Sequence, residues 1–202
     1  MIETLVELQN DHRNLVRLVT LLDKQATAEQ APDAAGLTLI ADAVYYLTHF
    51  PDVFHHPRED ALAGWLNRQG VLADALVRTL ATQHADLETQ GRDLLRDLES
   101  LVREETETWP GLAPRLGAYA KALRLNMATE EAQLLPIAFA EALNARQAIP
   151  AALALACEAD PLVQQTDERF AQLRAVIMTE ARCDCAARPA VTYQPNSGEP
   201  AS

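Results

Sequence analysis

The sequence predicts an all-α fold, namely an up-and-down four-helix bundle followed by an additional C-terminal helix and a disordered tail. Apolar residues recur at steps of three and four along almost the whole chain, which is the period of a helix with one buried face. No segment alternates in the way a half-buried strand does, and the breaks between periodic segments are short. Four long helices joined by modest loops favour an up-and-down bundle.

The first two helices are predicted from two periodic segments and the break between them. One face of the first contains Leu5, Leu8, His12, Leu15, Val19 and Leu22. The stretch "KQATAEQAPDAAG" ends that period, and a second pattern runs over about 37–68 and stops at Gly70, a residue that often follows a helix end. Pro51 and Pro57 lie within this second segment, so we expect them to kink or split the helix.

The third and fourth helices are predicted over about 71–105 and 115–144, with "TWPGLAP" closing the third. The buried face of the third contains Leu76, Leu80, His84, Leu87, Gly91, Leu94 and Leu98. The buried face of the fourth contains Tyr119, Leu123, Asn126, Glu130, Leu134 and Ile137. Each of these faces therefore combines leucines with one or two polar residues.

The C-terminal part of the chain differs from the four periodic segments. A last helix is predicted over about 161–181, with Asp160 as its N-cap. The tail that follows has no helical period and is rich in proline and small polar residues, so we expect it to be disordered. These patterns predict one domain over residues 1–182 and a disordered tail over 183–202.

Composition narrows the class of protein. The chain has 202 residues, 49% of them apolar and 23% charged, which suits a single domain with a substantial core. Its 29 acidic and 17 basic residues give a net charge of -12. That charge repels phosphate backbones and anionic lipids, so we expect neither nucleic acid nor a membrane as a partner.

The lack of a targeting signal and the small number of cysteines indicate a reducing compartment. No apolar run approaches the roughly 20 residues of a membrane span, and the start "MIETLVELQNDHRN" lacks the features of a signal peptide. The three cysteines, Cys157, Cys183 and Cys185, are too few and too late in the chain for a disulfide framework. We therefore expect a cytoplasmic protein.

Two adjacent histidines precede two adjacent acids in "FHHPRED", residues 54–60. Residues four apart share a helix face, so His55 pairs with Glu59 and His56 with Asp60. The face of the first pair continues with Leu62 and Leu66, and that of the second with Ala63 and Asn67. We therefore expect the first pair to point into the core and the second to lie nearer the surface.

Other buried faces supply further candidate metal ligands. His12 and His84 each lie between leucines on an otherwise apolar face, and Glu130 adds a carboxylate while Glu131 falls off that face. A lone histidine on such a face is more often a satisfied core residue than a ligand. Buried carboxylates, however, need a partner or a metal, and bundle cores that receive His and Glu from several helices hold carboxylate-bound metals. We expect His12, His55, Glu59, His84 and Glu130 to converge in one pocket.

Five stretches also carry a family resemblance over about residues 5–180: "DHRNL", "FPDVFHHPREDAL", "ATQH", "NMATEEAQLLPIA" and "EADPL". In this order they resemble the landmarks of the hemerythrin-like HHE cation-binding proteins. The resemblance implies a four-helix bundle with a non-haem di-iron centre bridged by two glutamates. Carried over residue by residue, it implies the metal ligands His12, His55, Glu59, His84 and Glu130.

The chain departs from that family pattern at Asn126, where the resemblance calls for the histidine of a second HxxxE motif. An amide oxygen is a weaker ligand than imidazole for first-row metals, so we expect a mononuclear or asymmetric centre. Open coordination positions would suit dioxygen or nitric oxide as a small diatomic ligand. The sequence thus predicts a protein that binds, senses or buffers iron, dioxygen or nitric oxide. Alternatives are a metal-free helical interaction module with a degraded site, and an iron-dependent oxidase or peroxidase.

Overall fold

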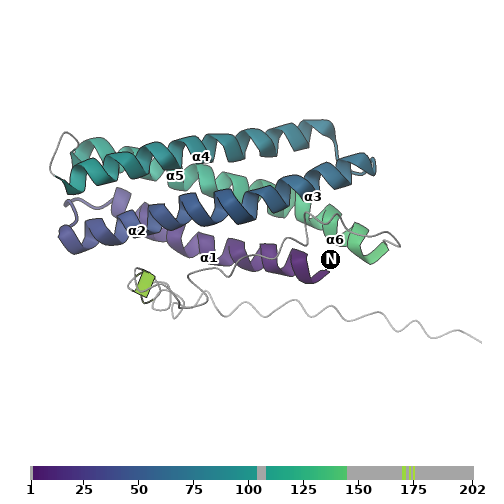
Figure 1. Ribbon diagram of the computed structural model, residues 1–202, viewed down its shortest axis with the longest axis horizontal. Coiled ribbons are helices and arrows are strands. Elements are labelled where there is room, and N and C mark those ends of the chain that lie inside the picture. The colour runs from purple at the N-terminus through teal and green to yellow at the C-terminus, as the bar shows by residue number, and fades with distance from the viewer. Residues whose placement is uncertain (1, 104–107, 145–169, 172, 174, 176–202) are drawn as a thin grey trace, which may run out of the picture.

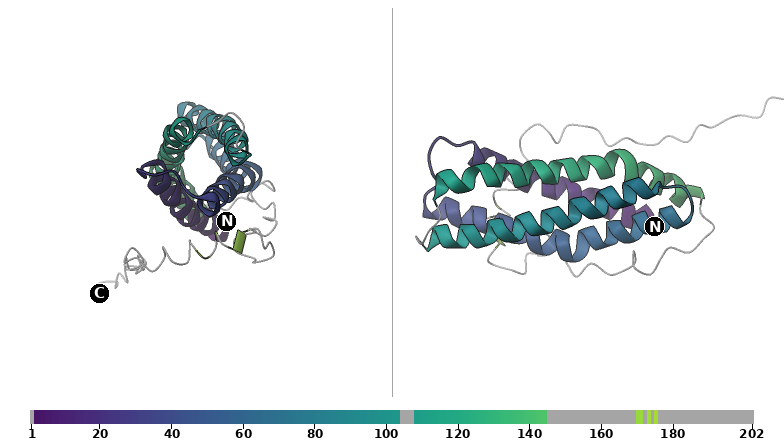
Figure 2. Two further views of the ribbon diagram at one scale, coloured as in Figure 1. Left: turned by 90° about the vertical axis from the view of Figure 1, so that its left-hand side faces the viewer. Right: turned by 90° about the horizontal axis from the view of Figure 1, so that it is seen from above.

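A computed structural model of the chain describes residues 2–103, 108–144, 170, 171, 173 and 175. These residues are almost all helical and contain no strand, which confirms the predicted all-α class. Four long rods lie side by side, and each rod runs antiparallel to the one before it (Figure 1). Seen end-on they surround a common axis, as an up-and-down four-helix bundle does (Figure 2).

The first rod is helix α1, Ile2–Ala26, and its buried residues include all six that the sequence period selects. The second rod starts with α2, Ala34–Phe50, where the carboxylate of the N-cap Asp33 accepts a hydrogen bond from the Gly36 backbone nitrogen at 2.8 Å. It continues through a π-helical turn η1, Pro51–His55, into α3, His56–Arg68. Gly70, with a φ of 74°, follows α3 in the left-handed region, as the sequence predicts.

The proline prediction for the second rod is modified by the structure. Pro51 neither splits the rod nor ends it, because the backbone widens into one π-helical turn in which the nitrogen of His56 donates to the carbonyl of Pro51. Pro57 lies in the first turn of α3, directly after the π-helical turn, so the change of helical pitch and the proline occur together. Such π-helical turns are frequent at functional sites, and this one ends at His55.

The third rod is α4, Asp74–Val102, and the fourth comprises α5, Trp109–Thr129, the π-helical turn η2, Glu130–Leu134, and α6, Leu135–Asn144. The fourth rod begins six residues earlier than predicted, because Pro110 falls in the first helical turn and Pro114, although inside the helix, does not end it. As in the second rod, a π-helical turn lies beside a proline, here Pro136, and contains a predicted site residue, Glu130.

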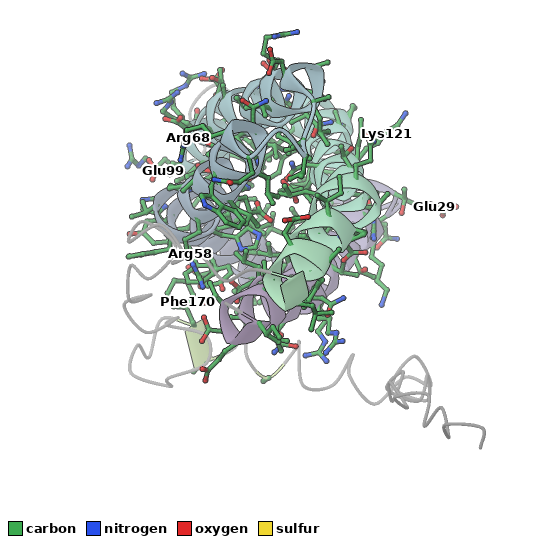
Figure 3. All side chains as sticks on the ribbon, turned by 90° about the vertical axis from the view of Figure 1, so that its right-hand side faces the viewer. Glu29, Arg58, Arg68, Glu99, Lys121 and Phe170 are labelled. Carbon is green, nitrogen blue, oxygen red and sulfur yellow. The ribbon has the colours of Figure 1, made fainter. Side chains whose placement is uncertain are left out.

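Two apolar clusters fill the bundle, and side chains occupy the space between the rods while charged residues such as Glu29 and Lys121 point outward (Figure 3). The larger cluster lies around α2, most of α5 and the second half of α1. The smaller cluster lies around α3, α6 and the first turns of α1. The predicted polar residues occupy the layer between the clusters, since His12 lies between Leu8 of the smaller and Leu15 of the larger.

Several predictions fall on residues at the C-terminal end. Of the predicted helix over 161–181 the structure describes only four residues, and Phe170 and Leu173 are buried against the larger cluster. The three cysteines and the tail over 183–202 lie outside the described residues. Within the described ranges, no helix is long and apolar enough to cross a membrane.

Candidate metal centre

The polar layer brings together the five side chains selected from the sequence, one or two from each rod. His12, Glu59 and Glu130 have no exposed surface, His55 is 1% exposed and His84 is 6% exposed. They come from α1, the η1–α3 junction, α4 and η2. The structure therefore places all five in one buried layer, and their role as metal ligands stays a prediction.

Glu59 lies at the centre of this layer. Its Oε1 is 3.1 Å from Nε2 of His12 and 3.2 Å from Nε2 of His55. Its Oε2 is 3.6 Å from Nε2 of His84. One carboxylate thus faces all three imidazoles, and it could contribute a ligand oxygen on both sides of the layer.

Glu130 completes the layer from the fourth rod. Its Oε1 is 2.9 Å from Nε2 of His84, and its Oε2 is 3.3 Å from Nε2 of His12. Two groups of three result, each with ligand atoms within 4.8 Å of one another. The first group is His12, His55 and Glu59, and the second is Glu59, His84 and Glu130.

Unpartnered atoms show that these residues fit a cation. His55 Nε2, Glu59 Oε2 and Glu130 Oε2 are buried and have no hydrogen-bond partner of good geometry. The nearest oppositely charged groups are Glu59 Oε1 at 3.2 Å, His84 Nε2 at 3.6 Å and His12 Nε2 at 3.3 Å, respectively. Buried polar atoms without a partner are rare and destabilising. Each of these atoms belongs to a residue of one or both groups, so the two donor sets are suited to metal ions.

In the metal-free protein, protons compensate the two carboxylates. Burial by itself lowers the histidine pKa values, but hydrogen bonds and charges from Glu59 and Glu130 outweigh it and raise the pKa of His12 to about 10. A hydrogen bond to Asp60, with the hydrogen bond and charge of Glu130 and the charge of Glu59, raises the pKa of His84 to about 10. The charge of Glu59 and a hydrogen bond to Asp11 raise the pKa of His55 to about 9. Burial raises the pKa of Glu59, yet the charge of His55 and the hydrogen bond of His12 hold it well below its usual range.

Each of the three imidazoles also contacts an outer carboxylate through Nδ1. His12 Nδ1 is 3.2 Å from Glu131, His55 Nδ1 is 3.2 Å from Asp11, and His84 Nδ1 is 3.0 Å from Asp60. Such contacts fix the ring so that Nε2 faces the centre, and they raise the basicity of a ligand.

These outer carboxylates were missed in the sequence. Glu131 indeed points off the buried face and is 51% exposed, yet it reaches His12, so it belongs to the site. A signal was present, because each outer carboxylate is the sequence neighbour of a candidate ligand: Asp11 of His12, Asp60 of Glu59, and Glu131 of Glu130. Each serves an imidazole from a different helix, however, and that pairing depends on how the helices pack.

The prediction for His56 is wrong. We expected it nearer the surface, but it is 4% exposed, with its ring stacked on that of His84 at 4.3 Å between centroids and 9° between planes. Consecutive helical residues point about 100° apart. His55 therefore faces α1 while His56 faces α4, and in a bundle both directions are covered. Asp60, by contrast, is 47% exposed, as expected.

Asn126 occupies the place where the family pattern calls for a histidine. It is 2% exposed, and its Nδ2 donates to Glu130 Oε1 at 2.7 Å and to Gln83 Oε1 at 3.4 Å. The amide nitrogen thus donates to the carboxylate and orients it. This nitrogen has no lone pair to offer a metal ion. The second group consequently contains one imidazole where the first contains two.

Comparison with known proteins supports the family resemblance. The family model of the hemerythrin HHE cation binding domain matches residues 4–138, about two thirds of the chain and all five candidate ligands. The chain belongs to this family. Searches of curated proteins and of solved structures found no match. Membership in the HHE family implies a metal-binding helical protein, and two buried groups of side chains here can hold a metal ion.

Proposed function

We propose that this HHE protein binds non-haem iron at an asymmetric or mononuclear centre and thereby carries, senses or buffers iron, dioxygen or nitric oxide. The observation that carries the proposal is the first group, in which two imidazoles and one carboxylate converge while fully buried. Two histidines and one carboxylate with open positions are a donor set typical of non-haem ferrous sites.

The two groups would hold iron unequally. His12, His55 and Glu59 would bind one ion tightly, with Glu130 Oε2 close to His12 as a further oxygen donor. His84 would hold a second ion with the two carboxylates only, because Asn126 uses its amide nitrogen toward Glu130. Fewer strong donors mean weaker binding. We therefore expect one tightly bound ion per chain and a second site of partial occupancy.

The surrounding residues control what the centre can do. The two apolar clusters exclude water from both sides of the polar layer, and the outer carboxylates hold the imidazole rings in place. The imidazoles must give up the protons that their raised pKa values hold in the metal-free protein. When bound, iron with an open coordination position supplies reversible binding of a diatomic ligand and one-electron redox chemistry.

Metal analysis of protein purified from iron-replete cells tests this proposal. We expect close to one iron per wild-type chain and a large loss in His55→Gln. His49→Gln is the matched control, because His49 is exposed and makes hydrogen bonds only to Thr48 and the Tyr45 carbonyl among the described residues. Equal iron in both variants, or none in the wild type, would contradict the proposal. Nitric oxide added to the reduced protein would then give a paramagnetic adduct detectable by electron paramagnetic resonance.

A metal-free interaction module is the second candidate, favoured by the Asn126 amide and the protonated histidines. Together they compensate both buried carboxylates without a metal. If the protein is such a module, we expect little iron after purification and the same melting temperature before and after treatment with a chelator. If the protein binds metal, we expect iron after purification and a lower melting temperature after treatment with a chelator, because a ligand that binds only the folded state stabilises it.

A further inference from the structure

A surface pocket of about 200 Å³ lies between α3 and α4, directly over one side of the candidate centre. Its polar lining comprises Asp52, His56, Asp60, His84 and Glu88. Of the five candidate ligands, His84 is the most exposed, at 6%, while the other four are at most 1% exposed. The pocket therefore lies where the buried centre comes closest to solvent.

The charge of this pocket favours cations. Three carboxylates line it, and no lysine or arginine is among the described residues that do. Asp52 and Glu88 also line an adjoining pocket of about 370 Å³, so these two carboxylates lie where the two pockets meet. Arg92, which pairs with Glu88 at 3.2 Å, lies in that second pocket and not in the first.

His56 is an independent observation that points to a metal ion. Its side chain is 6% exposed, and its Nδ1 lies 3.2 Å from Asp52. Its Nε2 has no partner among the described residues, and the ring lines the pocket while stacking on His84. An imidazole nitrogen that makes no hydrogen bond and lines a pocket beside carboxylates is a ligand suited to divalent transition metals.

The pocket is not itself a closed metal site. The side chains that the structure describes form only two groups with ligand atoms close enough to hold an ion, and neither includes His56 or Asp52. Ligands that attract an ion without enclosing it favour passage over storage. His56 connects the pocket to the centre, because its ring is stacked on His84, whose Nε2 lies 2.9 Å from Glu130.

We propose that this pocket is the route by which a hydrated divalent transition-metal cation enters the centre, with Asp52, Asp60 and Glu88 attracting the ion and His56 passing it to His84. The proposal rests on the proposed function, since it presupposes that the centre takes up metal. It adds the path of entry and the residues that determine the rate of loading.

Loading kinetics test the route. Metal-free full-length protein is mixed anaerobically with Fe²⁺ alone, samples are quenched with excess chelator, and protein-bound iron is measured against time. We expect Asp52→Asn/Glu88→Gln to slow uptake on the order of ten-fold at low salt, because each lost charge weakens attraction of a divalent ion nearby. The final iron content should equal that of wild type, and high salt should reduce the difference.

Asp86→Asn/Glu99→Gln is the matched control, because both residues are exposed on α4, carry the same total charge and line neither pocket. We expect its loading rate to be close to that of wild type. Equal slowing in this control would overturn the route in favour of a general effect of net charge. An unchanged rate in the pocket variant would overturn it directly.

Two single variants keep the test decisive if the double variant folds poorly. Glu88→Gln changes a side chain that is 55% exposed, and we expect it alone to slow uptake several-fold. His56→Phe keeps a ring against His84 but removes both nitrogens, so slower loading to the same final iron content is expected. Normal loading in both would overturn the route. Wild-type protein that takes up no Fe²⁺ would overturn the proposed function as well, whereas normal uptake insensitive to these variants would overturn the route alone.

Discussion

Replacing Glu59 with glutamine would remove the carboxylate that faces all three histidines of the centre. Glu59 is fully buried, and its oxygens lie 3.1 Å from His12, 3.2 Å from His55 and 3.6 Å from His84. Glutamine has nearly the same volume, so the substitution removes a charge without leaving a cavity. In the metal-free protein, Glu130 would then be the only fully buried carboxylate of the layer, in contact with His12 and His84, and His55 would keep only its outer partner Asp11.

The expected loss of stability follows from that geometry. Removing one partner of a buried ion pair destabilises a protein by about 3 to 5 kcal/mol, and for a chain of this size the melting temperature should fall by roughly 6 to 20 °C. The histidine pKa values are raised to about 9 to 10 in the folded protein, from 6.5. Their contribution to stability is therefore complete below about pH 6.5 and disappears as the pH rises through 9 to 10.

Glu59 has a lowered pKa, so its contribution is present above its ordinary value of 4.5 and is lost as the pH falls through the lowered pKa. The difference between wild type and Glu59→Gln should therefore be largest between about pH 4.5 and 6.5 and should shrink toward about pH 10.5. Urea denaturation of chelator-treated protein, followed by circular dichroism at about pH 6 and about pH 10.5, measures it. Glu99→Gln, at an exposed position, should change stability by no more than about 0.5 kcal/mol. An equal loss in Glu59→Gln at both pH values would refute the reasoning, because it would show that the charges of the histidines are irrelevant.

Three further outcomes are expected. Asn126→His should raise iron content toward two per chain, since it restores an imidazole four residues before Glu130, at an overpacking cost of about 1 to 3 kcal/mol. The control Leu125→His, on the exposed side of the same helix, should leave iron content unchanged. Two irons per wild-type chain would disprove the role of Asn126. Chelation of wild-type protein should lower the melting temperature, by an amount equivalent to about 2.7 kcal/mol if free metal had been at 100 times its dissociation constant, and readdition of Fe²⁺ should restore it. Gly91→Ala should destabilise the protein by about 1 to 3 kcal/mol in urea denaturation despite the helix propensity of alanine, because the added Cβ would lie 2.5 Å from Thr48 Cγ2 and 3.0 Å from the Tyr119 hydroxyl; unchanged stability would contradict this.

The helical period sufficed to select the residues of the central layer. His55 and Glu59 lie on the face that continues with Leu62 and Leu66, and that face is buried, so the register of the second rod was predictable. His12 and His84 were found in the same way, because leucines flank each of them at helical spacing. The sequence period reports which face of a helix is buried, and a polar residue on that face is conspicuous.

The sequence gives no comparable information about which helix covers each face. The burial of His56 depends on α4 lying beside α3, and the contact of Glu131 with His12 joins the fourth rod to the first. The early start at Trp109 depends on a proline that can either open or break a helix.

By itself the sequence determined the all-α bundle, the buried faces and the five residues of the central layer, because these follow from local periodicity. The tertiary structure decided which imidazole faces which carboxylate, how Asn126 binds Glu130, and that a pocket reaches His84. Those features depend on distances of a few ångströms between side chains from different helices. Such distances are set by how the helices pack and where π-helical turns shift the backbone, and neither is encoded in the spacing of residues along one helix.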